Sequence, residues 1–186
     1  RLETVSDEYG VPFYDIGNDD GVPDEDRLLD LLFEYNVDLV VLARYMRILG
    51  PNIVFRFEDR IINIHPSLLP AFPGAVAYRQ AREEGVRVAG VTAHYVTTDL
   101  DQGPIITQRA FNVPPEADIE TLKTKGQPLE ADALLEAIQL HLSDDITTHR
   151  GRTVPRNGTD SDEYQFGMQP DVDQLNPSEP VDKRLE

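Results

Sequence analysis

Two short polar segments carry side chains that could polarise a carbonyl group and move a proton. Residues 63–70 read Asn-Ile-His-Pro-Ser-Leu-Leu-Pro, and residues 94–104 read His-Tyr-Val-Thr-Thr-Asp-Leu-Asp-Gln-Gly-Pro. Both lie at the ends of apolar runs that are typical of β-strands. An amide (Asn63), an imidazole (His65) and a carboxylate (Asp101) held by rigid strands suit the chemistry of a one-carbon acyl group. In that chemistry, donors stabilise an oxyanion while a base takes a proton.

Each of these residues has an ordinary structural explanation when it is taken alone. His65 and Asn63 could satisfy backbone groups at a strand end, and Asp101 precedes a Gly-Pro turn. Their joint occurrence in two segments favours a catalytic site built from Asn63, His65 and Asp101. For His94, a supporting role behind these residues and a purely structural role both remain open.

A metal site is the competing chemical interpretation. His65, His94 and Asp101 could form a set of two histidines and one carboxylate. No spacing places two such ligands on one face of a helix, as metal-binding His-Glu-x-x-His does. We therefore predict no metal.

The elements that must position these residues alternate between helix and strand. An acidic first turn opens a helix that stops near residue 36, and a continuous apolar run at residues 39–43 predicts a central parallel strand buried on both faces. A short helical connection is expected at 51–57 and a strand at 60–64. Prolines 66 and 70 then impose an extended loop.

The same alternation continues to residue 142. We expect a helix at 75–84, an alternating strand at 88–95, a strand at 105–113, and a helix that begins at Pro128. This order predicts an α/β fold with an open, mostly parallel sheet and flanking helices. Ligands of such sheets bind beyond the carboxyl ends of the strands, where both polar segments lie.

The charge of the chain is strongly acidic. Its 186 residues include 34 Asp and Glu against 17 Lys and Arg, a formal net charge of −17. This charge favours adaptation to high salt over an ordinary solvated surface, and it argues against a nucleic-acid partner.

The chain has no cysteine, so disulfides and thiolate metal sites are excluded. With no signal-like start and no long apolar run, we expect a cytoplasmic protein without membrane contact, which could form a homo-oligomer.

Three segments resemble the folate-dependent formyltransferase family: residues 40–49, the His65 segment, and residues 92–108. The resemblance extends over residues 9–154, and it implies a formyltransferase-like, Rossmann-type fold. By position it implies that Asn63, His65 and Asp101 are catalytic. It also assigns folate contacts near the first of these segments and in the loop after residue 95, which correspond here to the following residues: Met46, Arg47, Leu49, Val96 and Thr97.

Four shorter segments, residues 43–46, 71–78, 92–97 and 140–142, resemble the hydrolytic branch of the family, the formyltetrahydrofolate deformylases. The resemblance implies hydrolysis of 10-formyltetrahydrofolate to formate and tetrahydrofolate, with no tightly bound cofactor. The segment His65 to Pro70 is closer to phosphoribosylglycinamide formyltransferases of purine biosynthesis, which remain the alternative. A catalytically silent folate-binding fragment is a further possibility.

The resemblance also sets the expected domain boundaries. Family members carry a regulatory domain and further strands before the point where this chain begins. We therefore expect residues 1–156 to form a catalytic domain that is incomplete at its N-terminus, and residues 157–186 to form an acidic, disordered tail.

Overall fold

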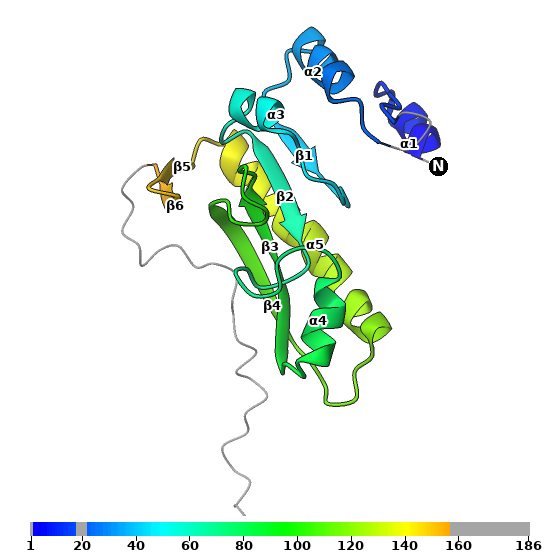
Figure 1. Cartoon of the computed structure of the whole chain (residues 1–186), viewed down its shortest axis with the longest axis vertical. Helices are drawn as coiled ribbons and strands as arrows, with labels where there is room; N and C mark the ends of the chain where they lie inside the picture. Colours follow the sequence, from blue (N-terminus) through cyan, green and yellow to red (C-terminus); the bar gives the residue numbers. More distant parts are fainter. Residues whose placement is uncertain (1, 18–21, 157–186) are drawn as a thin grey trace, which may run out of the picture.

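The computed structural model describes residues 2–17 and 22–156, which form an open sheet with helices on both faces (Figure 1). The expected tail, residues 157–186, lies outside the described residues. The elements in chain order are α1 (Leu2–Tyr9), α2 (Glu25–Glu34), β1 (Val40–Leu42), α3 (Pro51–Arg56), β2 (Ile61–His65), α4 (Ala77–Glu83), β3 (Val88–Tyr95), β4 (Ile105–Asn112), α5 (Ile119–Leu142), β5 (Ile146–His149) and β6 (Arg152–Pro155). Most of the expected helices and strands are confirmed.

The main sheet has four strands in the order β1-β2-β3-β4. The expected α/β class is confirmed, but the parallel arrangement holds only for β1 and β2 among the described strands. The pairs β2–β3 and β3–β4 are antiparallel. The reason lies in the connections: α3 carries the chain back between β1 and β2, whereas the loop and α4 after β2 leave the chain at the carboxyl end of that strand, where β3 begins. The sheet is therefore mixed.

The prediction that residues 39–43 form a central strand covered on both faces is wrong for the described part of the chain. Strand β1 lies at the edge of the sheet, where it pairs only with β2, and Val41 is 37% exposed. An apolar run indicates a strand, but it does not determine which strands lie beside it.

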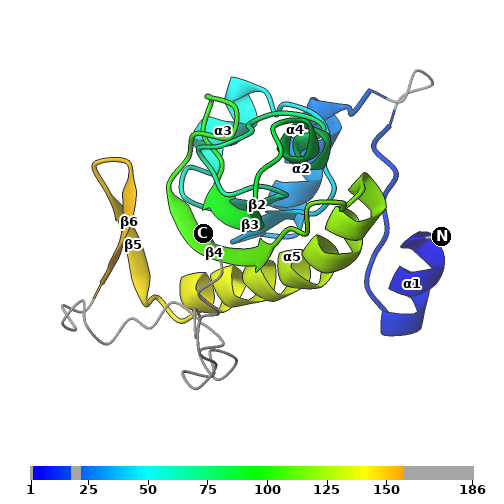
Figure 2. The same cartoon turned by 90° about the horizontal axis from the view of Figure 1, so that it is seen from below.

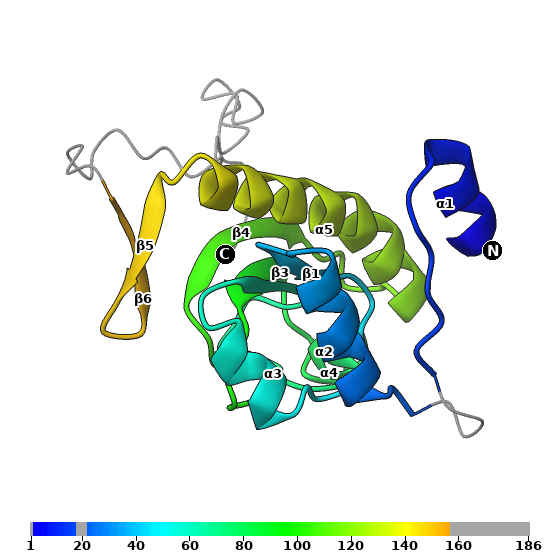
Figure 3. The ribbon, with the colours of Figure 1, turned by 90° about the horizontal axis from the view of Figure 1, so that it is seen from above.

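Helix α5 covers one face of the sheet, and α2 and α3 lie on the other (Figures 2 and 3). Under α5, the apolar core includes Ile62, Ala93 and Tyr95. On the opposite face, Ile61 packs with residues of α2 and α3, among them Leu29. Because alternate residues of a strand point to opposite faces, Ile61 shares its face with Asn63 and His65. The site therefore lies beside the α2–α3 core.

The prediction that a helix begins at Pro128 is wrong, because α5 begins nine residues earlier. The side chain of Asp118 accepts a hydrogen bond from the Thr121 N–H and caps the helix there. Pro128 lies inside the helix, where proline removes one backbone hydrogen bond. Burial of Leu122 and Ala133 on the sheet side offsets this loss.

Two peripheral elements were not predicted. Helix α1 has no buried residue and stands apart from the sheet, while β5 and β6 form a hairpin beyond the end of α5 (Figures 1 and 3). No helix in residues 2–17 or 22–156 is long and apolar enough to span a membrane.

Candidate functional site

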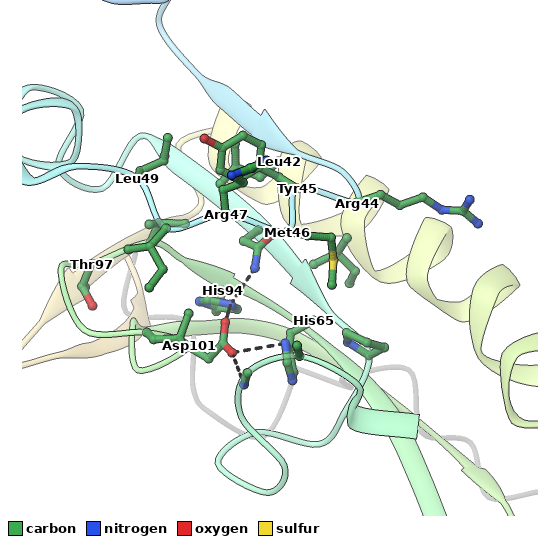
Figure 4. Close-up of a pocket in the computed structure, with 18 of the residues that line it drawn as sticks. Leu42, Arg44, Tyr45, Met46, Arg47, Leu49, His65, His94, Thr97 and Asp101 are labelled. Atoms are coloured by element: carbon green, nitrogen blue, oxygen red, sulfur yellow. Dashed lines mark hydrogen bonds and ion pairs between the residues drawn. The ribbon is translucent and has the colours of Figure 1, made fainter. Parts of the chain in front are cut away.

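A cavity of about 340 Å³ opens on the sheet face that carries Asn63 and His65. The segment after β1, the end of β2, the segment before α4, and the loop between β3 and β4 form its walls (Figure 4). All nine residues predicted for the site line it: Met46, Arg47, Leu49, Asn63, His65, His94, Val96, Thr97 and Asp101. The structure thus brings together residues that lie as far apart in the sequence as Met46 and Asp101.

The antiparallel pairing of β2 and β3 explains how the polar groups meet. Asn63 lies directly opposite His94 in the ladder, and His65 lies two residues further along β2 on the same face. Asn63 Nδ2 is 3.4 Å from His94 Nε2. The four polar side chains that meet here, Asn63, His65, His94 and Asp101, lie within residues 63–101, a single continuous segment of the chain.

Asp101 reaches the same centre from the loop that follows β3. Its carboxylate accepts a hydrogen bond of 2.6 Å from the Gly74 N–H, lies 3.4 Å from His65 Nδ1, and lies 3.8 Å from His94 Nε2 (Figure 4). Asp101 has a φ of +54°, a left-handed conformation that is uncommon outside glycine and that recurs at functional sites. The side chains of Asp101 and His65 are 7% and 6% exposed, so this pair is largely shielded from water.

His65 lies between two groups that can only accept hydrogen bonds. Its Nε2 is 2.9 Å from the Phe72 carbonyl oxygen, and its Nδ1 faces the Asp101 carboxylate. A neutral imidazole has one N–H and can serve one of these acceptors, whereas the imidazolium serves both. The arrangement suits a group that exchanges a proton during a reaction.

His94 has a different environment, which determines its tautomer. Its Nδ1 is 2.8 Å from the Tyr95 carbonyl oxygen, so Nδ1 carries the proton. Burial is the main cause that lowers the pKa of His94, because it penalises the charged imidazolium. The neutral ring presents a lone pair on Nε2, which accepts a hydrogen bond from the amide of Asn63.

Some residues at the site were not predicted. The Phe72 carbonyl and the Gly74 N–H act through the backbone, and the side chains of Thr92 and Gln108 lie behind the loop that holds Phe72. The sequence offered one signal, a glycine directly after Phe72-Pro73. In the structure Gly74 has a φ of +80°, a conformation that favours glycine. No group of three histidine, aspartate or glutamate side chains is arranged to hold a metal ion within the described ranges.

Comparisons with known proteins show the family to which the chain is related. The protein family described as "Formyl transferase" matches residues 22–138. Formyltetrahydrofolate deformylase of Bacillus subtilis (strain 168) is 47% identical over 133 residues, which are 72% of this chain and 44% of that protein. The chain spans about half the length of the curated relatives it matches.

Two solved structures have the same fold. A formyltetrahydrofolate deformylase from Pseudomonas syringae superposes with a TM-score of 0.79 at 36% identity, covering 83% of this chain and 52% of that one. A phosphoribosylglycinamide formyltransferase from Anaplasma phagocytophilum gives a TM-score of 0.78 at 35% identity, covering 85% of this chain and 77% of that one.

Proposed function

Because this chain belongs to the formyl transferase family, we propose that it carries the catalytic centre of a formyltetrahydrofolate deformylase. The reaction is hydrolysis of 10-formyltetrahydrofolate to formate and tetrahydrofolate. The observation that carries the proposal is the convergence of Asn63, His65 and Asp101 on one cavity. The curated relatives that share up to 47% identity with the chain carry the name of this hydrolase, which supports water as the acceptor.

The first requirement of this chemistry is a group that stabilises the oxyanion. Attack on the formyl carbon places negative charge on the formyl oxygen. Asn63 Nδ2 has two hydrogens: one is directed at His94 Nε2, and the second is available to the substrate. His94 thereby orients the amide of Asn63, and His65 Nδ1, when protonated, adds a second donor on the side of the ring that faces Asp101. Loss of one such donor typically costs about 10²–10³ in rate.

The second requirement is a path for the proton. Asp101 accepts a proton from the attacking water as the C–O bond forms. His65 passes its Nδ1 proton to N10 as the C–N10 bond breaks, so that formate and tetrahydrofolate leave. The proton held by Asp101 then returns to His65 Nδ1, which restores both groups for the next turnover. The 3.4 Å between His65 Nδ1 and Asp101 exceeds a typical charge-assisted hydrogen bond of about 2.8 Å. Catalytic contacts of this length commonly shorten when the substrate is bound.

The remaining predicted residues would bind the folate. Met46 is 75% exposed although it lines the cavity, and it offers apolar surface to the pterin and the aromatic ring that follows it. Ile48, which was not predicted, is 68% exposed, lines the same cavity and would add to this surface. Leu49 and Val96 contribute to the same wall, and the backbone near Met46 and Thr97 offers polar groups to the pterin edge.

We also propose that the protein works in the cytoplasm of a cell with high internal salt, because its net charge is −17.

A phosphoribosylglycinamide formyltransferase is the second candidate. The fold similarity to such an enzyme, with 77% of that chain covered, favours it. In this reaction an amine replaces water as the nucleophile, and the same three residues keep their roles.

The decisive experiment measures formate release from 10-formyltetrahydrofolate in molar KCl, with and without glycinamide ribonucleotide. Formate production without the ribonucleotide supports the hydrolase. Turnover that requires the ribonucleotide supports the transferase. A chain that binds folate yet is silent in both assays would be a binding fragment, and the catalytic proposal would fail.

A further inference from the structure

The loop at residues 66–72 presents the Phe72 carbonyl to His65, and one buried hydroxyl group fastens this loop to the sheet. The Thr92 side chain is 0% exposed. Its hydroxyl donates to the Ser67 carbonyl at 2.7 Å and accepts from the Leu69 N–H at 3.0 Å. It also accepts from Gln108 Nε2 at 2.9 Å. These three bonds use the single donor and both lone pairs of the hydroxyl.

Gln108 provides a second attachment for the same loop. Its Nε2 also donates to the Leu69 carbonyl at 3.1 Å, so Leu69 is held at both its N–H and its carbonyl. The loop packs closely on β3 next to this point, since a Cβ at Gly90 would lie 2.6 Å from Leu68 Cδ2. Gly90 and Thr92 point to the same face of β3, so the strand supports the loop with both contact and hydrogen bonds.

The register of the sheet connects these two residues to the catalytic histidine. Thr92 lies opposite His65 in the ladder of β2 and β3, and opposite Gln108 in the ladder of β3 and β4. His65, Thr92 and Gln108 thus form one row across three strands on the cavity side. The row fixes the loop relative to the strand that carries His65, and therefore fixes the distance from the Phe72 carbonyl to His65 Nε2.

We propose that Thr92 and Gln108 are positioning residues for His65, an inference that rests on the proposed function of this site. They hold residues 66–72 so that the Phe72 carbonyl takes the Nε2–H of His65. With Nε2 occupied, Nδ1 faces Asp101. Neither Thr92 nor Gln108 lines the cavity, so both act only through the loop.

A matched control separates this role from ordinary core stability. Thr107 is also a fully buried strand threonine, and its hydroxyl donates to the Ala133 carbonyl at 2.8 Å. It points to the opposite face of the sheet, under α5. Thr92→Val and Thr107→Val each remove one buried, hydrogen-bonded hydroxyl, so both are expected to lower the melting temperature.

The first measurement compares kcat and KM for formate release in the variants. We expect Thr92→Val and Gln108→Leu to lower kcat by about 10–10²-fold with little change in KM, because a small misplacement of a catalytic group has effects of this size. Thr92→Ser, which retains the hydroxyl, should restore most of kcat. Thr107→Val should keep the parent kcat. Equal losses in Thr92→Val and Thr107→Val would overturn the proposal.

The second measurement does not require activity. The chain has only four histidines, so the ring ¹⁵N chemical shifts of His65 can be assigned and report which nitrogen is protonated. We expect these shifts to move in Thr92→Val and Gln108→Leu and to stay unchanged in Thr107→Val. Unchanged His65 shifts in the first two variants would overturn the positioning role, whereas failure of the proposed function appears as a parent chain that releases no formate. If Thr92→Val does not fold, Gln108→Leu carries the test, because Gln108 is only partly buried.

Discussion

Three nitrogen atoms lie around the carboxylate of Asp101, and each comes from a different part of the site. The Gly74 N–H fixes the carboxylate in place, while His65 and His94 approach its two oxygens separately. In both histidines the other ring nitrogen faces a backbone carbonyl oxygen, that of Phe72 for His65 and that of Tyr95 for His94. Burial lowers the pKa of His94 and favours its neutral ring, so His65 is the imidazole suited to exchange a proton beside Asp101.

Substitution of Asp101 tests this arrangement most directly. Asp101→Asn keeps the shape and removes the charge, so we expect kcat to fall by about 10²–10⁴-fold, the range of a general acid–base group. Folate affinity should remain close to that of the parent, because the apolar walls of the cavity are untouched. Formate release and equilibrium folate binding are the measurements. Asp38→Asn, the same change at an exposed position, is the control, and near-parent activity of Asp101→Asn would contradict the assignment.

The buried His94 makes stability depend on pH. Its pKa in the folded protein lies below the ordinary value of 6.5, so the unfolded chain binds a proton more readily. The stability that the neutral His94 contributes is complete above pH 6.5. It is lost as the pH falls from 6.5 towards the lower pKa that His94 has in the folded protein. Burial lowers the pKa of His141 as well, which adds to the same trend.

We therefore expect the free energy of unfolding to decrease as the pH falls from about 8 to 5. Urea denaturation at a series of pH values measures it. His94→Gln should give a shallower dependence on pH than the parent, whereas His149→Gln, at an exposed hairpin position, is the matched control. A His94→Gln variant with the full parent slope would show that His94 does not contribute.

At the level of elements, patterns along the chain predicted well which residues form helices and strands. They predicted poorly which strands lie side by side in the sheet. Strict alternation identified β3, and the apolar run before His65 identified β2. The edge position of β1 could not be predicted, because it depends on pairing rather than on composition. Thr92 and Gln108 were missed for the same reason: their alignment with His65 exists only once β2, β3 and β4 are in register. The left-handed backbone of Asp101 was likewise not predicted, because few residues other than glycine adopt a positive φ.

The packing of α4 on α5 predicts that replacing a helical glycine by alanine destabilises the fold, which is the opposite of the usual effect. Gly126 lies inside α5, where alanine normally stabilises a helix by about 1 kcal/mol. A Cβ at this position would contact the Tyr78 hydroxyl and would lie 2.7 Å from Tyr78 Cζ. We expect Gly126→Ala to destabilise the fold by about 1–3 kcal/mol, the typical cost of overpacking.

Thermal or urea denaturation measures this effect, and a double-mutant cycle provides the control. Tyr78→Ala removes the ring that causes the clash, so Gly126→Ala should be neutral or stabilising in that background. Equal effects of Gly126→Ala in both backgrounds would rule out the contact with Tyr78 as the cause.

For the whole molecule, charge is the dominant property. The net charge of −17 produces self-repulsion in the compact state, and salt shortens the range of this repulsion from about 10 Å at 0.1 M to about 3 Å at 1 M. We expect the melting temperature to rise steadily with KCl over this range. Replacing the exposed pair Glu83 and Glu84 by glutamine should weaken the dependence on salt. A melting temperature that is independent of KCl would contradict adaptation to high salt.

The position of α5 after the catalytic segment has a consequence for synthesis on the ribosome. The polar groups that meet at Asp101 lie within residues 63–101. The helix that covers the other face of the same strands ends only at residue 142. A nascent chain can therefore form the β2–β3 pair while Ile62, Ala93 and Tyr95 still face water. Until α5 emerges, this apolar face is available to chaperones and to other nascent chains.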